Sequence, residues 1–291
     1  MKVGVISEIL EFIKSARQLM SDYVDASSPQ LSQCAGFLQS SKRAQIAKKL
    51  YVSSAMTTDS IIILIEHGLI WDAISLFRSL LEGSARFCYL LSTTTEEEEI
   101  KCFHEFEEVL SYKSMMSLEQ RVSNMKKGHL YKHDKTNAYL DRIEANVKGI
   151  AHGISNEAAE IKKKWNFFNL SSVLRSECPE WAVMADQWEF RYATSNFAIH
   201  KDGVIVGPDI THWMKETSPD NPLVRVWAPS LLSFCVGIVR DRLVALMRKF
   251  DLDCTVLRDM MKQNIDFANL ATKMESEARA EFPNRDDDGH L

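Results

Sequence analysis

The sequence predicts an all-α protein, a multi-helix bundle with long central helices and a C-terminal helical pair. Pro29 is the only proline before Pro179, so a long stretch lacks the residue that helix interiors reject most strongly. Apolar residues recur at three- and four-residue steps along much of the chain, which is the pattern of amphipathic helices. With 291 residues and 14 Phe, the chain can build a large hydrophobic core.

The N-terminal part predicts two long helices. Residues 4–24 carry an apolar stripe, and Ser27, Ser28 and Pro29 should break that helix. A second helical stretch covers 41–91, with Gly68 as the position where it can break. Its middle is apolar on nearly every side, so we expect it at the centre of the bundle.

The next helix has clear end signals. Thr95 and the four glutamates Glu96 to Glu99 form a capped start, because hydroxyls and carboxylates suit the positive end of a helix. Lys126, Lys127 and Gly128 form the matching end. Weaker helical patterns follow at 134–150 and 155–165.

The C-terminal part begins with a helix that Pro179 can start and that runs from Glu180 to His200. A helical pair then covers 229–250 and 253–281, joined near Asp251. The expected organisation is an N-terminal helix at 1–40, a helical core bundle at 41–207, a loop with the C-terminal helical pair at 208–282, and a flexible tail at 283–291.

Composition excludes several classes of protein. The net charge of −5 argues against a surface that binds nucleic acid all over, and leaves a local basic groove open. Six cysteines without any C-x-x-C pair indicate a reduced compartment. The N-terminus lacks a signal-peptide core, and charges interrupt the most apolar stretch, Ile61 to Leu81. We therefore expect a cytoplasmic protein that does not enter the membrane.

Charged residues interrupt the most apolar helix at regular steps. Arg78, Glu82 and Arg86 are four residues apart and share one helix face. Burying such charges is costly unless they form ion pairs or bind a ligand or substrate. One interpretation is an internal ion pair that fixes helix packing. The other makes Glu82 an acid, base or ligand, with Arg78 orienting it or binding phosphate.

A second polar row lies on the helix that ends at His200. Tyr192, Asn196 and His200 are also four residues apart, and Ser195 lies beside them. The negative end of the helix dipole favours a charged imidazole at His200. The row either forms hydrogen bonds to a neighbouring helix, with His200 as the C-terminal cap, or it is part of a catalytic site. Buried polar groups of neighbouring helices need hydrogen-bond partners. We therefore expect Glu82 or Arg78 to lie within hydrogen-bond reach of Tyr192, Asn196 or His200. The pocket around them should be lined by Phe77, Phe197 and a tryptophan.

The R-S-L-L-E helix and the later Y-x-x-x-[SN]-x-x-x-H helix together resemble a family of bacterial all-helical proteins known only as a domain of unknown function. The resemblance covers residues 45–205 and implies a fold more than an activity. More distantly, the chain is similar to HEPN-type helical domains, many of which are metal-independent RNases of toxin–antitoxin and phage-defence systems. Those enzymes use an Arg and a His, and Arg191 and His200 are spaced more widely here.

Other candidates carry weaker signals. His129 and His133 have a spacing that suits zinc on a helix, but no Glu follows the first, so we interpret them as loop histidines and expect no metal. Trp165 follows three lysines and could stack on a nucleic-acid base. The chain has no nucleophile elbow, P-loop or Rossmann fingerprint, and we expect no cofactor.

Two functional hypotheses follow. The first is a helical bacterial effector, an endoribonuclease of phage defence or a toxin–antitoxin system. Its catalytic residues would be His200, Arg191, Glu82 and Arg78, and its RNA-binding residues Tyr192, Asn196, Ser195 and Trp165. The alternative is a non-catalytic sensor or adaptor that binds a partner protein, such as an antitoxin or a second copy of the chain. The contact surface would be the acidic tail and the C-terminal helical pair at 229–281.

Overall fold

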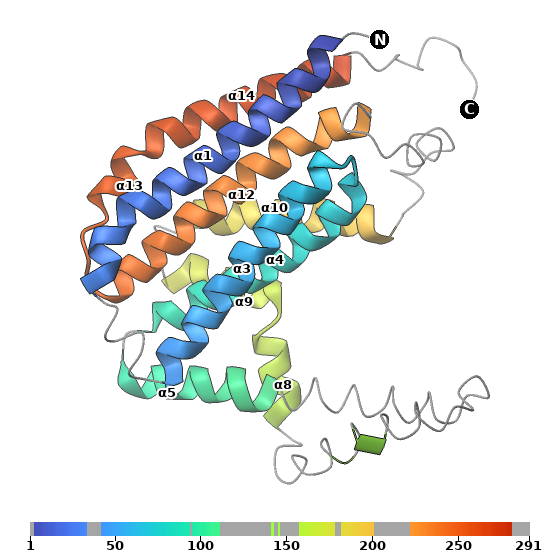
Figure 1. Ribbon diagram of the computed structural model, residues 1–291. Coiled ribbons are helices and arrows are strands. Elements are labelled where there is room, and N and C mark those ends of the chain that lie inside the picture. The colour runs from blue at the N-terminus through green and yellow to red at the C-terminus, as the bar shows by residue number, and fades with distance from the viewer. Residues whose placement is uncertain are drawn as a thin grey trace, which may run out of the picture. The chain divides into compact units, whose positions relative to one another are not determined.

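The computed structural model describes residues 3–33, 42–93, 95–110, 141–142, 145, 157–177, 182–200 and 222–280. All regular structure in these ranges is helical, which confirms the predicted all-α class (Figure 1). The backbone contacts divide the chain into two units, Met1–Ser92 with Leu174–Leu291, and Thr93–Val173. Among the helices of the described ranges, none has the length and apolar character needed to cross a membrane.

The larger unit is built around one long helix, α12. Its helices in the described ranges are α1 (Val3–Gln33), α3 (Lys42–Glu66), α4 (Ile70–Ser92), α10 (Ala182–His200), α12 (Pro222–Lys249), α13 (Thr255–Asp259) and α14 (Met261–Ala280). Helix α12 packs against α1, α3, α4 and α14, while α10 packs on α4 (Figure 1). Val224, Leu232 and Val236 of α12 are fully buried, which agrees with its central place.

The turn between α3 and α4 forms at Gly68, as the sequence predicted. Gly68 has a φ of 75°, a left-handed conformation that favours glycine. The amide of Leu69 donates to the carbonyl of Leu64 (2.8 Å), and the amide of Gly68 donates to that of Ile65 (3.0 Å). This Schellman pattern satisfies carbonyls at the end of α3 and reverses the chain.

Helix α12 ends in the same way at Asp251, which confirms the predicted junction. Asp251 has a φ of 52°. The amide of Leu252 donates to Met247 O (2.9 Å), and that of Asp251 to Arg248 O (3.0 Å). The second helix of the C-terminal pair is divided into the short α13 and the long α14.

Two prolines lie inside helices, contrary to the sequence prediction. The break expected at Ser27, Ser28 and Pro29 is wrong, because α1 continues to Gln33. Similarly, α12 begins at Pro222 and contains Pro229, where the sequence placed the helix start. A proline removes one backbone hydrogen bond, and the packing of a long helix can offset that loss. Ser27 is fully buried, and its hydroxyl donates to Tyr23 O at 2.9 Å.

The smaller unit contains α5 (Glu96–His104), the π-helix η1 (Glu105–Val109), α8 (Glu157–Lys164) and the first part of α9 (Phe167–Glu177). The predicted start of α5 is confirmed as a capping box. The Thr95 hydroxyl accepts from Glu98 N (3.2 Å), and the Glu98 carboxylate accepts from Thr95 N (3.3 Å). Helix α8 confirms the pattern at 155–165, whereas Lys126 to Gly128 and most of 134–150 lie outside the described residues.

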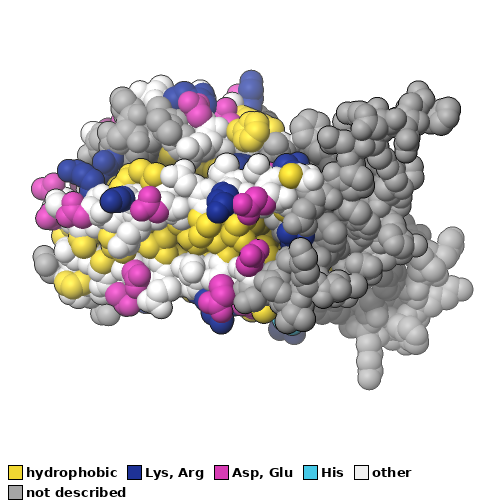
Figure 2. Space-filling model, turned by 90° about the horizontal axis from the view of Figure 1, so that it is seen from above, with side chains coloured by type: hydrophobic (Ala, Val, Ile, Leu, Met, Phe, Trp, Pro, Cys, Tyr) yellow, Lys and Arg dark blue, Asp and Glu magenta, His cyan; other side chains and the backbone are white. Residues whose placement is uncertain are grey.

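Hydrophobic side chains form a strip on the side of the larger unit where α1 and α14 lie. In Figure 2 the strip runs between charged side chains. Phe12 of α1 stacks on Phe267 of α14, with ring centroids 4.3 Å apart. Elsewhere on α14, Ile265 and Leu270 remain 51% and 45% exposed. This helix therefore offers apolar side chains to solvent as well as to the core.

Candidate functional site

Helix α4 presents a row of alternating charges at the edge of its buried face. Glu82 lies between two arginines, because steps of four residues return to nearly the same face. Its Oε1 is 3.3 Å from Arg78 Nε, and its Oε2 is 3.8 Å from Arg86 Nη2. The Glu82 and Arg78 side chains are both 30% exposed, so the row is half-buried and reachable from solvent.

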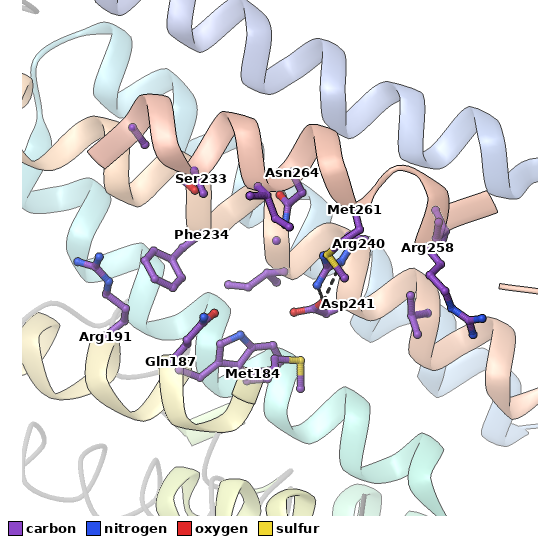
Figure 3. A pocket seen from close by; sticks show the side chains of 18 of the residues that line it. Met184, Gln187, Arg191, Ser233, Phe234, Arg240, Asp241, Arg258, Met261 and Asn264 are labelled. Carbon is purple, nitrogen blue, oxygen red and sulfur yellow. Dashed lines mark hydrogen bonds and ion pairs between the residues drawn. The ribbon is translucent and has the colours of Figure 1, made fainter. Parts of the chain in front are cut away.

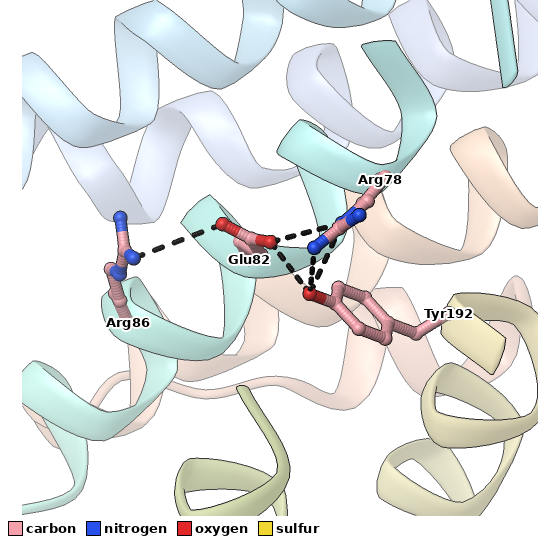
Figure 4. Close-up of polar contacts among 4 residues, drawn as sticks. All are labelled: Arg78, Glu82, Arg86 and Tyr192. Atoms are coloured by element: carbon pink, nitrogen blue, oxygen red, sulfur yellow. Dashed lines mark hydrogen bonds and ion pairs between the residues drawn. The ribbon is translucent and has the colours of Figure 1, made fainter. Parts of the chain in front are cut away.

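Tyr192 of α10 joins this row from across the helix interface (Figure 4). Its hydroxyl accepts hydrogen bonds from Arg78 Nη2 (2.8 Å) and Arg78 Nε (3.1 Å). It donates in turn to Glu82 Oε1 (2.8 Å). The Arg78 guanidinium carbon lies 4.8 Å from the centre of the tyrosine ring. These contacts confirm the predicted hydrogen-bond connection between the α4 charges and the α10 row.

The other expected members of the site are placed less completely. Helix α10 runs through Ser195 and Asn196 to His200, but the side chains at 194–200, including Phe197, lie outside the described residues. Phe77, an expected lining residue, is buried and packs edge to face against Phe234, with ring centroids 6.3 Å apart. Phe77 therefore supports the core beside the cluster.

The surroundings of Tyr192 keep its phenol protonated. Burial is the main cause that raises the pKa of Tyr192, the Glu82 carboxylate raises it further, and Arg78 opposes both. The phenol is thus a hydrogen-bond donor at neutral pH. Arg78 uses Nε and Nη2 in its bonds to described residues. Its Nη1 can still donate to an anion that approaches the half-exposed face.

Arg191, the neighbour of Tyr192 in sequence, lies in a different environment. Its guanidinium carbon is 4.3 Å from the centre of the Phe234 ring. Burial lowers the pKa of Arg191, while Glu275 acts in the opposite direction. The structure therefore does not bring Arg191 to the Arg78–Glu82–Tyr192 cluster, where the sequence had grouped it with these catalytic candidates.

Arg191 lines a cavity of about 530 Å³ between α10, α12 and α14 (Figure 3). We call it the arginine-lined cavity, because Arg240, Arg248 and Arg258 also line it. At its wall, Arg240 Nη2 pairs with Asp241 Oδ1 at 2.6 Å. Burial raises the pKa of Asp241, and Arg240 opposes this.

These charged residues of α12 are not among the site residues predicted from the sequence. The available signal was the run Arg240-Asp241-Arg242, three consecutive charges within an apolar helix. Consecutive residues point to different sides of a helix, so at least one of three such charges must face the protein interior when the helix is central. Arg242 is the most deeply buried of the three, with 3% exposure, and the side chains of Arg240 and Asp241 are 15% and 14% exposed.

Trp165 lies in the smaller unit and has an internal role. It is 2% exposed, its Nε1 donates to Glu105 Oε2 (2.8 Å), and its ring packs on Phe106. Lys164 pairs with the same carboxylate oxygen at 2.7 Å. Stacking on a nucleic-acid base, expected for Trp165, finds no support in this buried position. The candidate histidines His129 and His133 are outside the described residues.

The fold and the polar cluster define an all-helical protein with a half-buried Arg–Glu–Tyr network between two core helices. Residues 45–205 match a family of unknown function, DUF5677. This range is more than half of the chain, and the protein belongs to that family. Neither a curated protein nor a solved structure matches the chain.

Proposed function

We propose that the face formed by α4 and α10 binds a phosphate of RNA and that the protein is an effector RNase acting without a metal. The observation that carries the proposal is the geometry of Arg78. Tyr192 and Glu82 fix its guanidinium on a half-exposed surface, and Nη1 has no bond to a described residue. A fixed arginine with free donors is suited to the phosphoryl oxygens of a substrate.

The proposed reaction is attack of a ribose 2′-oxygen on the adjacent phosphorus. The 2′-O–P bond forms, the P–O5′ bond breaks, a base takes the 2′-hydroxyl proton, and an acid gives a proton to the 5′-oxygen. Arg78 stabilises the charge that develops on the phosphoryl oxygens, and Glu82 positions Arg78. His200, at the end of the same helix as Tyr192, transfers a proton. Arg191 has no role in this scheme, because it lies in the arginine-lined cavity.

The test is cleavage of single-stranded, structured and transfer RNA in the presence of EDTA. We expect His200→Ala to lower the rate by about 10²- to 10⁴-fold and Arg78→Gln by about 10²- to 10³-fold. Arg175→Gln is the matched control. Arg175 lies on α9 and forms ion pairs with Asp186 and Glu189 of α10, the helix that also carries Tyr192 and His200. An intact RNA panel after incubation with the folded protein would overturn the proposal, as would full activity in His200→Ala.

An adaptor that binds a partner protein is the second candidate. Ile265 and Leu270, exposed on α14, favour it, because α14 belongs to the C-terminal helical pair. Apolar side chains at a surface can serve as anchors of a protein interface. If Ile265→Lys with Leu270→Lys abolishes function in cells, and His200→Ala and Arg78→Gln do not, the adaptor replaces the RNase.

A further inference from the structure

Arg242 is a buried arginine on the side of α12 away from the arginine-lined cavity. It is 3% exposed. Its Nη2 donates to Leu50 O of α3 at 2.8 Å. Its guanidinium carbon lies 4.5 Å from the centre of the Phe87 ring and 5.4 Å from that of Tyr51. Two aromatic faces and one carbonyl are thus its neighbours.

Among the described residues, the charge of Arg242 has no anionic partner. Within the described part of the chain, no carboxylate forms an ion pair with it, and its buried Nε has no hydrogen-bond acceptor. Burial lowers the pKa of Arg242 to about 10, so the side chain is still charged at neutral pH. Cation–π contacts offset only part of the cost of burying a charge. A guanidinium with five N–H donors can bind an oxyanion through two of them at once.

A cavity of about 340 Å³ between α1, α3 and α12 has Arg242 in its wall. We call it the Arg242 cavity. Tyr51, Ser54 and Thr58 of α3 bring hydroxyl groups to it. Arg17 of α1 brings a second cation, whose Nη2 is 2.9 Å from Glu66. Asp59, the carboxylate in this lining, is exposed and forms no ion pair with Arg242.

Apart from Ser21, whose hydroxyl donates to Asp25, the remaining wall of the Arg242 cavity is apolar. Met20 and Val24 of α1 and Ile238 of α12 contribute to it. A ligand that fits this lining has an oxyanion at one end and an apolar body next to it, because each part then meets groups of matching polarity. The cavity is too small for a protein segment of many residues and large enough for a small organic molecule.

We propose that the Arg242 cavity binds the phosphate or carboxylate group of a small organic molecule, with Arg242 as the anchor. The anion accepts hydrogen bonds from the Arg242 guanidinium and compensates its buried charge. The Tyr51 and Ser54 hydroxyls of α3 complete its coordination, whereas the Thr58 hydroxyl donates to Ser54 O. This site uses α1, α3 and α12, and is separate from the α4 and α10 residues of the proposed RNase.

The experiment measures thermal unfolding of the full chain with inorganic phosphate, a nucleoside monophosphate or octanoate, each compared with chloride at equal ionic strength. For a ligand at ten times its dissociation constant, we expect the melting temperature of the wild type to rise by about 3 °C. Arg242→Met should lose this shift. Lys273→Met, which removes an exposed cation of α14 outside both cavities, should keep it.

The ligand series separates the possible sources of the anion. A shift with inorganic phosphate supports a site for a phosphate group alone, and a larger shift with the nucleotide or octanoate shows that the apolar wall also contributes. Arg242→Lys keeps the positive charge but cannot form the bidentate hydrogen bonds of a guanidinium, so it should show a smaller shift of the melting temperature. This variant tests the proposal even if Arg242→Met does not fold. The proposal fails if no anion shifts the wild type, or if Arg242→Met or Arg242→Lys responds fully.

Discussion

Two buried tyrosines of the larger unit have hydroxyls in opposite situations. The Tyr192 hydroxyl accepts from Arg78 and donates to Glu82. The Tyr23 hydroxyl is buried, and no residue of the described ranges forms a hydrogen bond with it. Burial is the main cause that raises the pKa of Tyr23 to about 12, with Arg240 and Asp241 acting in opposite directions. Removing each hydroxyl should therefore affect stability differently.

We predict that Tyr192→Phe lowers the free energy of unfolding by about 1.5–3 kcal/mol, because hydrogen bonds to charged partners are lost. Tyr23→Phe should leave it unchanged or raise it by up to about 1 kcal/mol, because an unsatisfied buried group is removed. Urea unfolding at pH 7 measures both changes, and the two variants control for each other. If both variants lose the same free energy of unfolding, the hydrogen bonds of Tyr192 contribute no more to stability than the unbonded hydroxyl of Tyr23.

Residues of the α4 and α10 cluster could be predicted because their signal is local. Arg78 and Glu82 stand at four-residue steps in an apolar helix, and Tyr192 opens a similar polar row. For Arg242, the run of three charges indicates a buried charge but not its partner, since its acceptor, Leu50 O, lies 192 residues away. Only the packing of α3 against α12 shows that Arg242 is the most deeply buried of the three consecutive charges.

Helix ends were predictable where the chemistry of the end itself decides them. Gly68 and Asp251 end helices through left-handed backbone and Schellman hydrogen bonds, and Thr95 starts α5 through its hydroxyl. Pro29 and Pro229 gave wrong helix boundaries. A local breaker can be overruled when the helix on both sides of it is packed in a core, and the sequence does not show that packing.

The two left-handed turns provide a matched pair of substitutions. We predict that Gly68→Ala lowers the free energy of unfolding by about 1 kcal/mol, because a side chain disfavours this backbone conformation. Asp251→Gly should raise it by a few tenths to about 1 kcal/mol, because the same strain is removed at an exposed site. Thermal and urea unfolding give both values. A loss of stability in Asp251→Gly would argue against the left-handed turn.

In the whole molecule, α12 is the central helix of the larger unit. The sequence does not show that the chain divides into two units. Leu232 and Val236 lie at the contacts of α12 and are fully buried. The boundary at Val173 and Leu174 falls inside α9, so no linker composition marks it. The smaller unit has its own buried network, in which Glu105 binds Trp165 and Lys164.

Separate contact networks predict separate local unfolding. Trp165→Phe removes the Nε1 donor to the buried Glu105, which costs about 1.5–3 kcal/mol, and should accelerate amide exchange of α5 and the first part of α9 by about tenfold or more. Leu232→Ala, costing about 2–5 kcal/mol, should instead accelerate exchange in α1, α4 and α12. Hydrogen–deuterium exchange with mass spectrometry resolves these segments. The same acceleration in both units by Trp165→Phe would mean that the chain opens as one cooperative unit, because a weakened network then lowers the stability of every helix equally.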